Sequence, residues 1–250
     1  MGRFFTAPRR FFSTTPGEGV ETVRHDIPLP ALAGMKLAFF SDIHASPRFP
    51  DAAMEALFAR VAALGADVIC IGGDLAEDAT SLARLLCFFP LLRARLGVFA
   101  CLGNNDREIV GFARLVAGHM RLLINESVLV EGLRLGGVDE RKYGQPRPEA
   151  VFPHGGACAR VLLSHYPLAY DFGAGARPDL QLCGHTHGGQ WCVLGISPYT
   201  FFFEARGHGW VSGECTLGGV RAVVSNGIGM SKFNLRVGAP PQVHLVRFTV

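Results

Sequence analysis

The 250-residue sequence has no C-x-x-C pair, no apolar run of about 18 residues and little net charge. Its seven cysteines are an odd number at scattered positions, so neither a disulfide framework nor a structural zinc knuckle is expected. A reducing, cytoplasmic location is favoured, and no helix is expected to cross a bilayer. The formal charge of +3 argues against strong nucleic-acid binding, and the hydrophobic fraction of 49% excludes intrinsic disorder.

Acidic side chains are also missing from the first 17 residues, which contain three arginines and four phenylalanines: Arg3, Arg9, Arg10, Phe4, Phe5, Phe11 and Phe12. Such a segment is compatible with peripheral contact to an anionic surface, here the inner membrane, and also with a frayed terminus or a transit-like leader. We expect residues 1–30 to form a basic, aromatic N-terminal segment and residues 31–250 to form a single domain.

Apolar runs and amphipathic stretches alternate in the first half of the chain. Strands are predicted at 35–40, 67–71 and 97–102, and helices at 51–65, 79–95 and near 107–118. This alternation is typical of βαβ units and a mainly parallel sheet. The second half predicts a hairpin at 128–138, buried strands at 160–164 and 180–183, and antiparallel pairs within 211–225 and 243–250. The whole is therefore an α/β chain.

Side chains of metal-ligand type directly follow five of the predicted strands. The segments are Ser41-Asp42-Ile43-His44, Gly72-Gly73-Asp74, Gly103-Asn104-Asn105-Asp106, Ser164-His165-Tyr166 and Gly184-His185-Thr186-His187-Gly188-Gly189. Because the carboxyl ends of strands in an open sheet face one crevice, these segments are expected to converge. The glycines would let the backbone turn sharply and let a substrate approach closely.

The ligand types themselves indicate the kind of ion. Carboxylates combined with imidazoles and an amide suit Mn²⁺, Fe²⁺ or Zn²⁺ better than Ca²⁺ or Mg²⁺, which prefer oxygen ligands. Seven such residues are too many for one tetrahedral ion. They suit two ions about 3.5–4 Å apart that share a bridging carboxylate, as in two-metal phosphoryl chemistry.

The ordered motifs D-x-H, G-D, G-N-x-D, a lone His and G-H-x-H resemble those of the calcineurin-like metallophosphoesterase superfamily. The resemblance covers residues 36–190. The segments 184–190 and 224–229 are similar to the YkuE- and YaeI-type bacterial phosphodiesterase branch. The resemblance implies a metallophosphoesterase fold, a four-layer αββα sandwich of two mixed sheets. It also implies hydrolysis of a phosphoester by a metal-bridging hydroxide.

Matching the motifs residue by residue implies two divalent metal ions, with manganese favoured over iron, zinc or nickel. Asp42, His44 and His187 resemble the ligands of one ion, and Asp74 resembles the bridging carboxylate. The ligands of the other ion are matched by Asn104, His165 and His185. The residues expected to take part in catalysis are Asp74 and Asn105.

Asn105 departs from the family pattern, which has a histidine at this position. An asparagine can donate a hydrogen bond but cannot act as a general acid near neutral pH, and loss of a general acid typically costs about 10²–10⁴-fold in rate. We therefore expect phosphodiesters or diphosphates as substrates, either small or lipid-linked. Two alternatives stay open: a UDP-2,3-diacylglucosamine-type pyrophosphatase, and a non-catalytic docking module. The oligomeric state is not predicted.

Other polar residues are assigned structural roles. Asp106 is expected to cap the helix after it, and 136–139 to form a turn. His208 is expected to fill a loop, with contact to a substrate phosphate as the alternative. The aromatic stretch 199–203 is expected to form a buried strand, with lining of an acyl groove or contact to a membrane surface near the site as alternatives. Four further histidines are treated as ordinary surface or core residues: His25, His119, His154 and His244.

Overall fold

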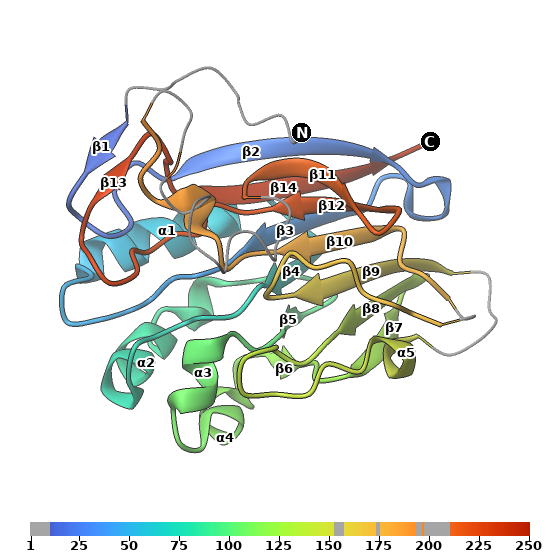
Figure 1. Cartoon of the computed structure of the whole chain (residues 1–250), viewed down its shortest axis with the longest axis horizontal. Coiled ribbons are helices and arrows are strands. Elements are labelled where there is room, and N and C mark those ends of the chain that lie inside the picture. Colours follow the sequence, from blue (N-terminus) through green and yellow to red (C-terminus); the bar gives the residue numbers. More distant parts are fainter. Residues whose placement is uncertain (1–10, 153–157, 174–175, 194–196, 198–210) are drawn as a thin grey trace.

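The computed structural model describes residues 11–152, 158–173, 176–193, 197 and 211–250. The stretches 1–10 and 199–203, together with His154 and His208, lie outside the described residues. The first of two six-stranded mixed sheets has the order β2-β14-β3-β4-β5-β6. Its strands are β2 (Glu21–Pro28), β14 (Gln242–Thr249), β3 (Lys36–Phe40), β4 (Val68–Ile71), β5 (Val98–Ala100) and β6 (Arg121–Leu122). Strands β3 to β6 run parallel, as the alternation of strands and helices predicts (Figure 1).

The second six-stranded sheet has the order β11-β12-β10-β9-β8-β7. Its strands are β11 (Gly213–Leu217), β12 (Val220–Val224), β10 (Leu180–Cys183), β9 (Ala159–Ser164), β8 (Leu133–Gly137) and β7 (Glu126–Val130). The inner strands are parallel, whereas β7 and β11 pair antiparallel with their neighbours. Residues 136 and 137 thus belong to a strand rather than a turn. A separate ribbon pairs β1 (Phe12–Ser13) with β13 (Arg236–Val237).

The helices are α1 (Asp51–Ala63), α2 (Ala79–Leu86), α3 (Asn104–Glu108), α4 (Phe112–Val116) and α5 (Pro148–Val151), with 3₁₀ turns η1 (Pro30–Leu32), η2 (Phe89–Leu91) and η3 (His187–Gly189). The helix predicted over 79–95 ends at Leu86, because Pro90 lacks an N–H and disfavours helical backbone before it. The helix predicted near 107–118 is two short helices separated at Gly111, whose φ is +75°. Among the described residues, no helix has the length and apolar character needed to cross a membrane.

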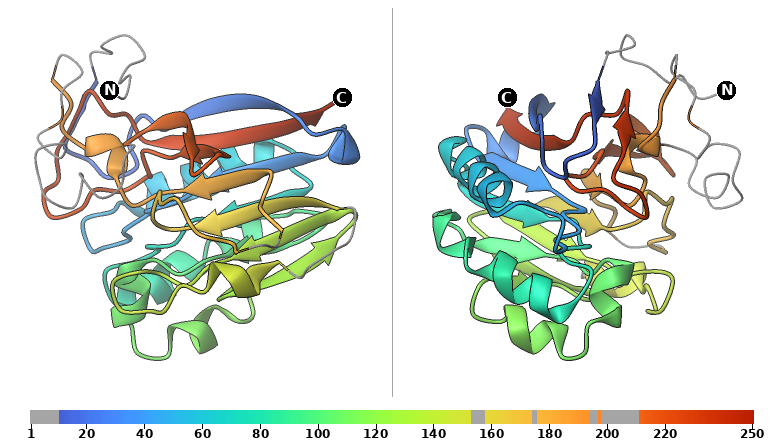
Figure 2. Two further views of the ribbon diagram at one scale, coloured as in Figure 1. Left: turned by 45° about the vertical axis from the view of Figure 1, so that its right-hand side comes forward. Right: turned by 90° about the vertical axis from the view of Figure 1, so that its left-hand side faces the viewer.

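Alternate side chains of the central strands enter different layers of the core. Phe39 packs between the two sheets with Leu163 of β9, whereas Phe40 faces the helices and contacts Phe58 of α1. On the outer side of the second sheet, Leu162 packs against Val151 of α5. The molecule is therefore the four-layer αββα sandwich that the resemblance implies, with α5 and neighbouring loops as a thin fourth layer (Figure 2).

Strand β2 lies within the stretch that the sequence sets apart as an N-terminal segment. Residues 21–28 pair in parallel with β14 over the whole length of both strands. The first sheet therefore begins at Glu21, ahead of the boundary expected at residue 31. The alternation in β2 is weak, because only His25 and Ile27 of this strand are buried.

Candidate metal centre

Five strands from both sheets end at the same side of the molecule. Asp42, Asp74 and Asn104 follow β3, β4 and β5 of the first sheet. His165 follows β9 and His185 follows β10 of the second sheet. The convergence expected from the sequence is thus achieved by the packing of two sheets, not by one.

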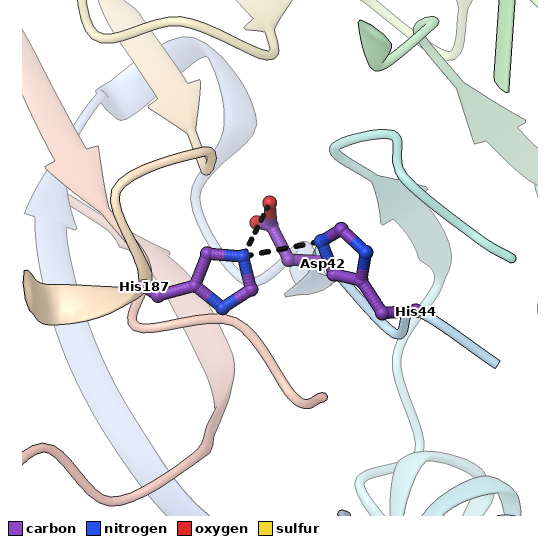
Figure 3. A group of neighbouring side chains, drawn as sticks. All are labelled: Asp42, His44 and His187. Atoms are coloured by element: carbon purple, nitrogen blue, oxygen red, sulfur yellow. Dashed lines mark hydrogen bonds and ion pairs between the residues drawn. The ribbon is translucent and has the colours of Figure 1, made fainter. Parts of the chain in front are cut away.

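A first cluster consists of Asp42, His44 and His187, all at most 6% exposed. One ligand atom from each lies within 4.8 Å of the others. The Nε2 atom of His187 is 3.1 Å from Nε2 of His44 and 3.7 Å from Oδ1 of Asp42. Figure 3 shows the three side chains pointing toward one another, although 145 positions separate the first from the last.

A second cluster shares Asp42 with the first and adds Asp74 and His165. Oδ2 of Asp74 lies 3.4 Å from Nε2 of His165 and 3.5 Å from Nε2 of His44, so this carboxylate stands between the two clusters. The Nδ1 atom of His165 contacts the Gly72 carbonyl at 2.8 Å, which leaves Nε2 for an ion. Two carboxylates surrounded by imidazole nitrogens fit divalent ions such as Mn²⁺, Fe²⁺ or Zn²⁺.

The remaining two predicted ligands, His185 and Asn104, belong to neither cluster of three. His185 places Nδ1 3.2 Å from Nε2 of His165, and its backbone N–H donates to both carboxylate oxygens of Asp42 at 3.0 Å. Asn104 accepts from the Tyr166 hydroxyl at 3.2 Å and donates to the side chain of Asn105 at 2.6 Å. The structure thus brings His185 to the centre, while the role of Asn104 as a ligand stays a prediction.

Left-handed backbone is concentrated at this site. Five of the predicted ligands have a positive φ: Asp42 (+53°), His44 (+46°), Asp74 (+54°), His185 (+69°) and His187 (+52°). Each such residue costs on the order of 1–3 kcal/mol, a strain that clusters at functional sites. Hydrogen bonds between the loops offset it, including Asp42 N–H to the Gly73 carbonyl at 2.9 Å.

Two glycines make room for carboxylates. A Cβ atom on Gly103 would overlap with the carboxylate of Asp74, and one on Gly184 would overlap with that of Asp42. The sequence suggested that such glycines admit the substrate. In the structure they admit the proposed ligands themselves.

Glu77 is a site residue that the sequence reasoning missed. Its carboxylate accepts a hydrogen bond from Nδ1 of His44, and it also lies 3.2 Å from the amide nitrogen of Asn105. A proton held on Nδ1 leaves Nε2 of His44 free as a ligand, the usual arrangement of a carboxylate behind a metal-binding histidine. The only signal in the sequence is an acid three residues after Asp74.

Asp106 caps the start of a helix as expected, but from the third helical position, because the N-cap residue of α3 is Gly103. It is the third residue of α3, and its carboxylate accepts backbone N–H groups from Gly103 and Asp74 at 2.8 Å and from Leu75 at 2.9 Å. Burial, together with the charge of Asp74, raises the pKa of Asp106 to about 7. This side chain ties the loop of Asp74 to α3.

Arg236 is another missed residue, fully buried behind His187. Its guanidinium donates to the carbonyl oxygens of His187 at 3.2 Å, Asn226 at 2.8 Å and Ala239 at 3.1 Å. Burial lowers the pKa of Arg236 to about 9. A single arginine between Leu235 and Val237 carries no motif by which the sequence could have revealed it.

Charges in the centre are strongly coupled. Burial opposes ionisation of Asp74, but the charge and hydrogen bond of His165 hold its pKa well below the usual range. Although burial favours a neutral imidazole, Asp74 and Asp42 raise the pKa of His165 to about 10. Burial raises the pKa of Asp42, and burial with the charges of His44 and Arg236 lowers that of His187. Metal binding here would therefore release protons.

Comparison with known proteins agrees with this geometry. The chain is 31% identical over 206 residues to a transmembrane protein with metallophosphoesterase domain of Bos taurus, covering 72% of this chain and 46% of that protein, so it spans about half of this relative's length. It is 27% identical over 273 residues to phosphodiesterase YaeI of Escherichia coli, covering 98% and 97%. It is 35% identical over 80 residues to UDP-2,3-diacylglucosamine pyrophosphatase LpxG of Chlamydia muridarum, covering 30% and 23%.

The family model of calcineurin-like phosphoesterases matches residues 35–189, a stretch that runs from the residue before β3 to the end of η3. It includes all seven predicted ligands and Asn105. The ordered motifs, the two mixed sheets and the clustered carboxylates and imidazoles are thus explained together: the chain belongs to the calcineurin-like phosphoesterase family.

Proposed function

We propose that the chain hydrolyses a phosphodiester or diphosphate bond with two divalent metal ions, manganese being favoured. One observation carries the proposal, the sharing of carboxylates between the two clusters: Asp42 belongs to both, and Oδ2 of Asp74 lies between Nε2 of His44 and Nε2 of His165. Two adjacent ion positions with shared carboxylates are the arrangement that phosphoryl transfer by two metals requires.

The side chains of this site have separable tasks. Bound divalent ions supply Lewis acidity and activate water. Asp42 and Asp74 would hold both positions, while Glu77 fixes the ring of His44. The amide of Asn105, 3.3 Å from Nδ1 of His44, would donate a hydrogen bond to substrate but supplies no proton. The leaving group must therefore be acidic enough to depart without a general acid.

The test compares bis-p-nitrophenyl phosphate with p-nitrophenyl phosphate on purified protein loaded with Mn²⁺. Diester turnover is expected to exceed monoester turnover and to vanish in Asp74→Asn. This variant suits the site because asparagine tolerates the left-handed backbone at +54° while removing the charge. Asp26→Asn is the matched control, since Asp26 is an exposed acid paired with Arg247.

Turnover that survives in Asp74→Asn would refute the proposed mechanism. Absence of turnover with Mn²⁺, Fe²⁺, Zn²⁺ and Ni²⁺, in protein shown to bind them, would contradict a general phosphodiesterase. It would favour the docking module instead. A substrate-restricted pyrophosphatase would be distinguished by then assaying UDP-linked lipids.

A nucleotide-diphospho-lipid pyrophosphatase is the second candidate, supported by Asn105 and by the similarity to LpxG. A diphosphate releases a phosphate, which is already acidic and needs no general acid. Asn105→His is expected to raise turnover of alkyl phosphomonoesters, within the range of about 10²–10⁴-fold that general-acid catalysis supplies. No gain on alkyl monoesters, with diester turnover retained, would count against the role assigned to Asn105.

A further inference from the structure

The ribbon of β1 and β13 has an inverted distribution of polar and apolar side chains. In β13 the charged Arg236 points inward to the metal centre and is fully buried, whereas its neighbour Val237 is half-buried on the opposite side. Successive strand residues face opposite sides, so the apolar side chains of this ribbon are turned outward. An ordinary surface strand has the reverse arrangement.

Five apolar residues gather on this outward side, which we call the apolar ridge: Phe12, Trp191, Val193, Phe233 and Val237. Phe12 and Trp191 pair with Val237 from its two sides, and paired residues share one face. Val193 is two residues after Trp191, and the ring of Phe233 lies 5.5 Å from that of Trp191.

Three members of the ridge protrude far into solvent. Phe12 is 70% exposed, and Val193 and Phe233 are each 61% exposed. A group of large apolar side chains on one exposed face marks a surface that binds something. Exposed aromatic and aliphatic side chains are also typical of segments that insert at the headgroup boundary of a membrane.

The ridge is joined to the metal centre by short hydrogen-bonded links. Gln190, three residues after His187, donates to the carbonyl oxygens of Ser231 at 3.1 Å and Phe233 at 3.0 Å. Arg236 links β13 to the backbone of His187. Figure 1 shows β1 and β13 at the end of the molecule where the loops after β9 and β10 lie.

The residues around the ridge favour a negatively charged partner. The segments 11–17, 187–193 and 229–238 contain no aspartate or glutamate, and the exposed Lys232 stands next to Phe233. In the sequence alone, three arginines precede β1, outside the described residues: Arg3, Arg9 and Arg10. Basic residues near an apolar anchor contribute about 1 kcal/mol each at an anionic lipid surface.

We propose that the apolar ridge docks the protein on an anionic phospholipid bilayer. Phe12, Val193 and Phe233 insert at the headgroup boundary and bring the metal centre to phosphate groups of lipids. The lipid-binding role stands on the ridge alone, whereas the lipid-linked nature of the substrate rests on the proposed function.

The test is sedimentation of the full chain with vesicles of phosphatidylcholine, alone or with phosphatidylglycerol. Binding is expected to the mixed vesicles and to fall at least about tenfold in a Phe12→Ser, Phe233→Ser double variant. The matched control is Val110→Ser, because Val110 is 94% exposed but lies between α3 and α4. Equal binding by the double variant and the control, or no binding by the wild type, would overturn the proposal.

Fluorescence locates the contact independently. The chain has two tryptophans, so Trp210→Phe leaves Trp191 as the sole reporter, and its emission is expected to shift to the blue with mixed vesicles. A shift without vesicles that grows with protein concentration would instead identify a second copy as the partner. Asp74→Asn is expected to bind vesicles like the wild type, so a failure of the proposed catalysis would leave this result intact.

Discussion

Two buried histidines in this protein each contact a partly exposed glutamate through Nδ1. Nδ1 of His44 contacts Glu77, and Nδ1 of His25 contacts Glu214 at 2.7 Å. Both glutamate side chains are 42% exposed, and both histidines are at most 4% exposed. Composition alone would therefore assign the two pairs the same role.

The other ring nitrogen separates the two histidines. Nε2 of His25 meets Nδ1 of His244 at 3.0 Å, and both residues belong to regular strands, β2 and β14. Nε2 of His44 instead faces the Asp74 carboxylate from a left-handed loop. Buried carboxylates and strained backbone, not histidine content, thus distinguish a metal centre from a structural link between sheets.

The largest expected difference between the metal centre and the His25–His244 pair is in stabilisation of the folded state by a metal ion. A ligand present at 1,000 times its Kd stabilises the folded state by about 4 kcal/mol. Mn²⁺ is expected to raise Tm in the wild type and in His244→Leu but not in Asp42→Asn, as measured by calorimetry with a chelator as reference. Retention of the full effect in Asp42→Asn would place the ion elsewhere.

The two glutamates, Glu77 and Glu214, are expected to differ in a second, smaller effect, their influence on metal affinity. Removing the carboxylate behind a metal-binding histidine typically lowers metal affinity by about 10–100-fold. Glu77→Gln is expected to show this loss in isothermal titration with Mn²⁺, whereas Glu214→Gln should match the wild type. Equal affinities in the two variants would show that Glu77 has no part in positioning His44.

Acid is expected to lower the stability of the folded protein through the His25–His244 pair. Burial, with the charge of His25, lowers the pKa of His244 from 6.5 to about 3. Because the folded pKa lies below the unfolded one, the stability contributed is complete above about pH 6.5 and is lost as pH falls toward 3.

At pH 5.5, one unit below the ordinary value of 6.5, the loss amounts to about 1.4 kcal/mol. Glu214, which contacts His25, and Arg221, which pairs with Glu214, are the charged groups next to this pair, and both stay in place in His244→Leu. Urea unfolding at pH 7.5 and 5.5 should therefore show a smaller drop for His244→Leu than for the wild type. An equal drop would assign the acid sensitivity to other groups.

The order of strands and helices could be predicted where periodicity is strong. Val68–Ile71 is buried on both faces, and its continuous apolar run predicts a buried strand. The hairpin of β7 and β8 is predicted from the alternation of apolar and polar residues in that stretch. Strand β2 was missed because only two of its residues are buried, and its partner β14 is more than 200 positions away. Such a pairing leaves no local signal.

The site followed from motifs to the extent that its residues lie in them. Asp42, His44, Asp74, His165 and His187 are brought together as expected. The supporting residues could not be found in this way, because their roles depend on packing. Arg236 reaches the backbone of His187 from β13, 49 positions further along the chain.

The sharing of Asp42 by both clusters has a consequence for the order of folding. Its partners come from positions 44 to 187, and from both sheets, so no part of the chain can form the centre alone. We expect these long-range contacts to form after the folding transition state, and to break before it during unfolding. A bound ion should therefore slow unfolding while leaving the refolding rate unchanged. The metal would stabilise the folded protein kinetically without assisting its folding.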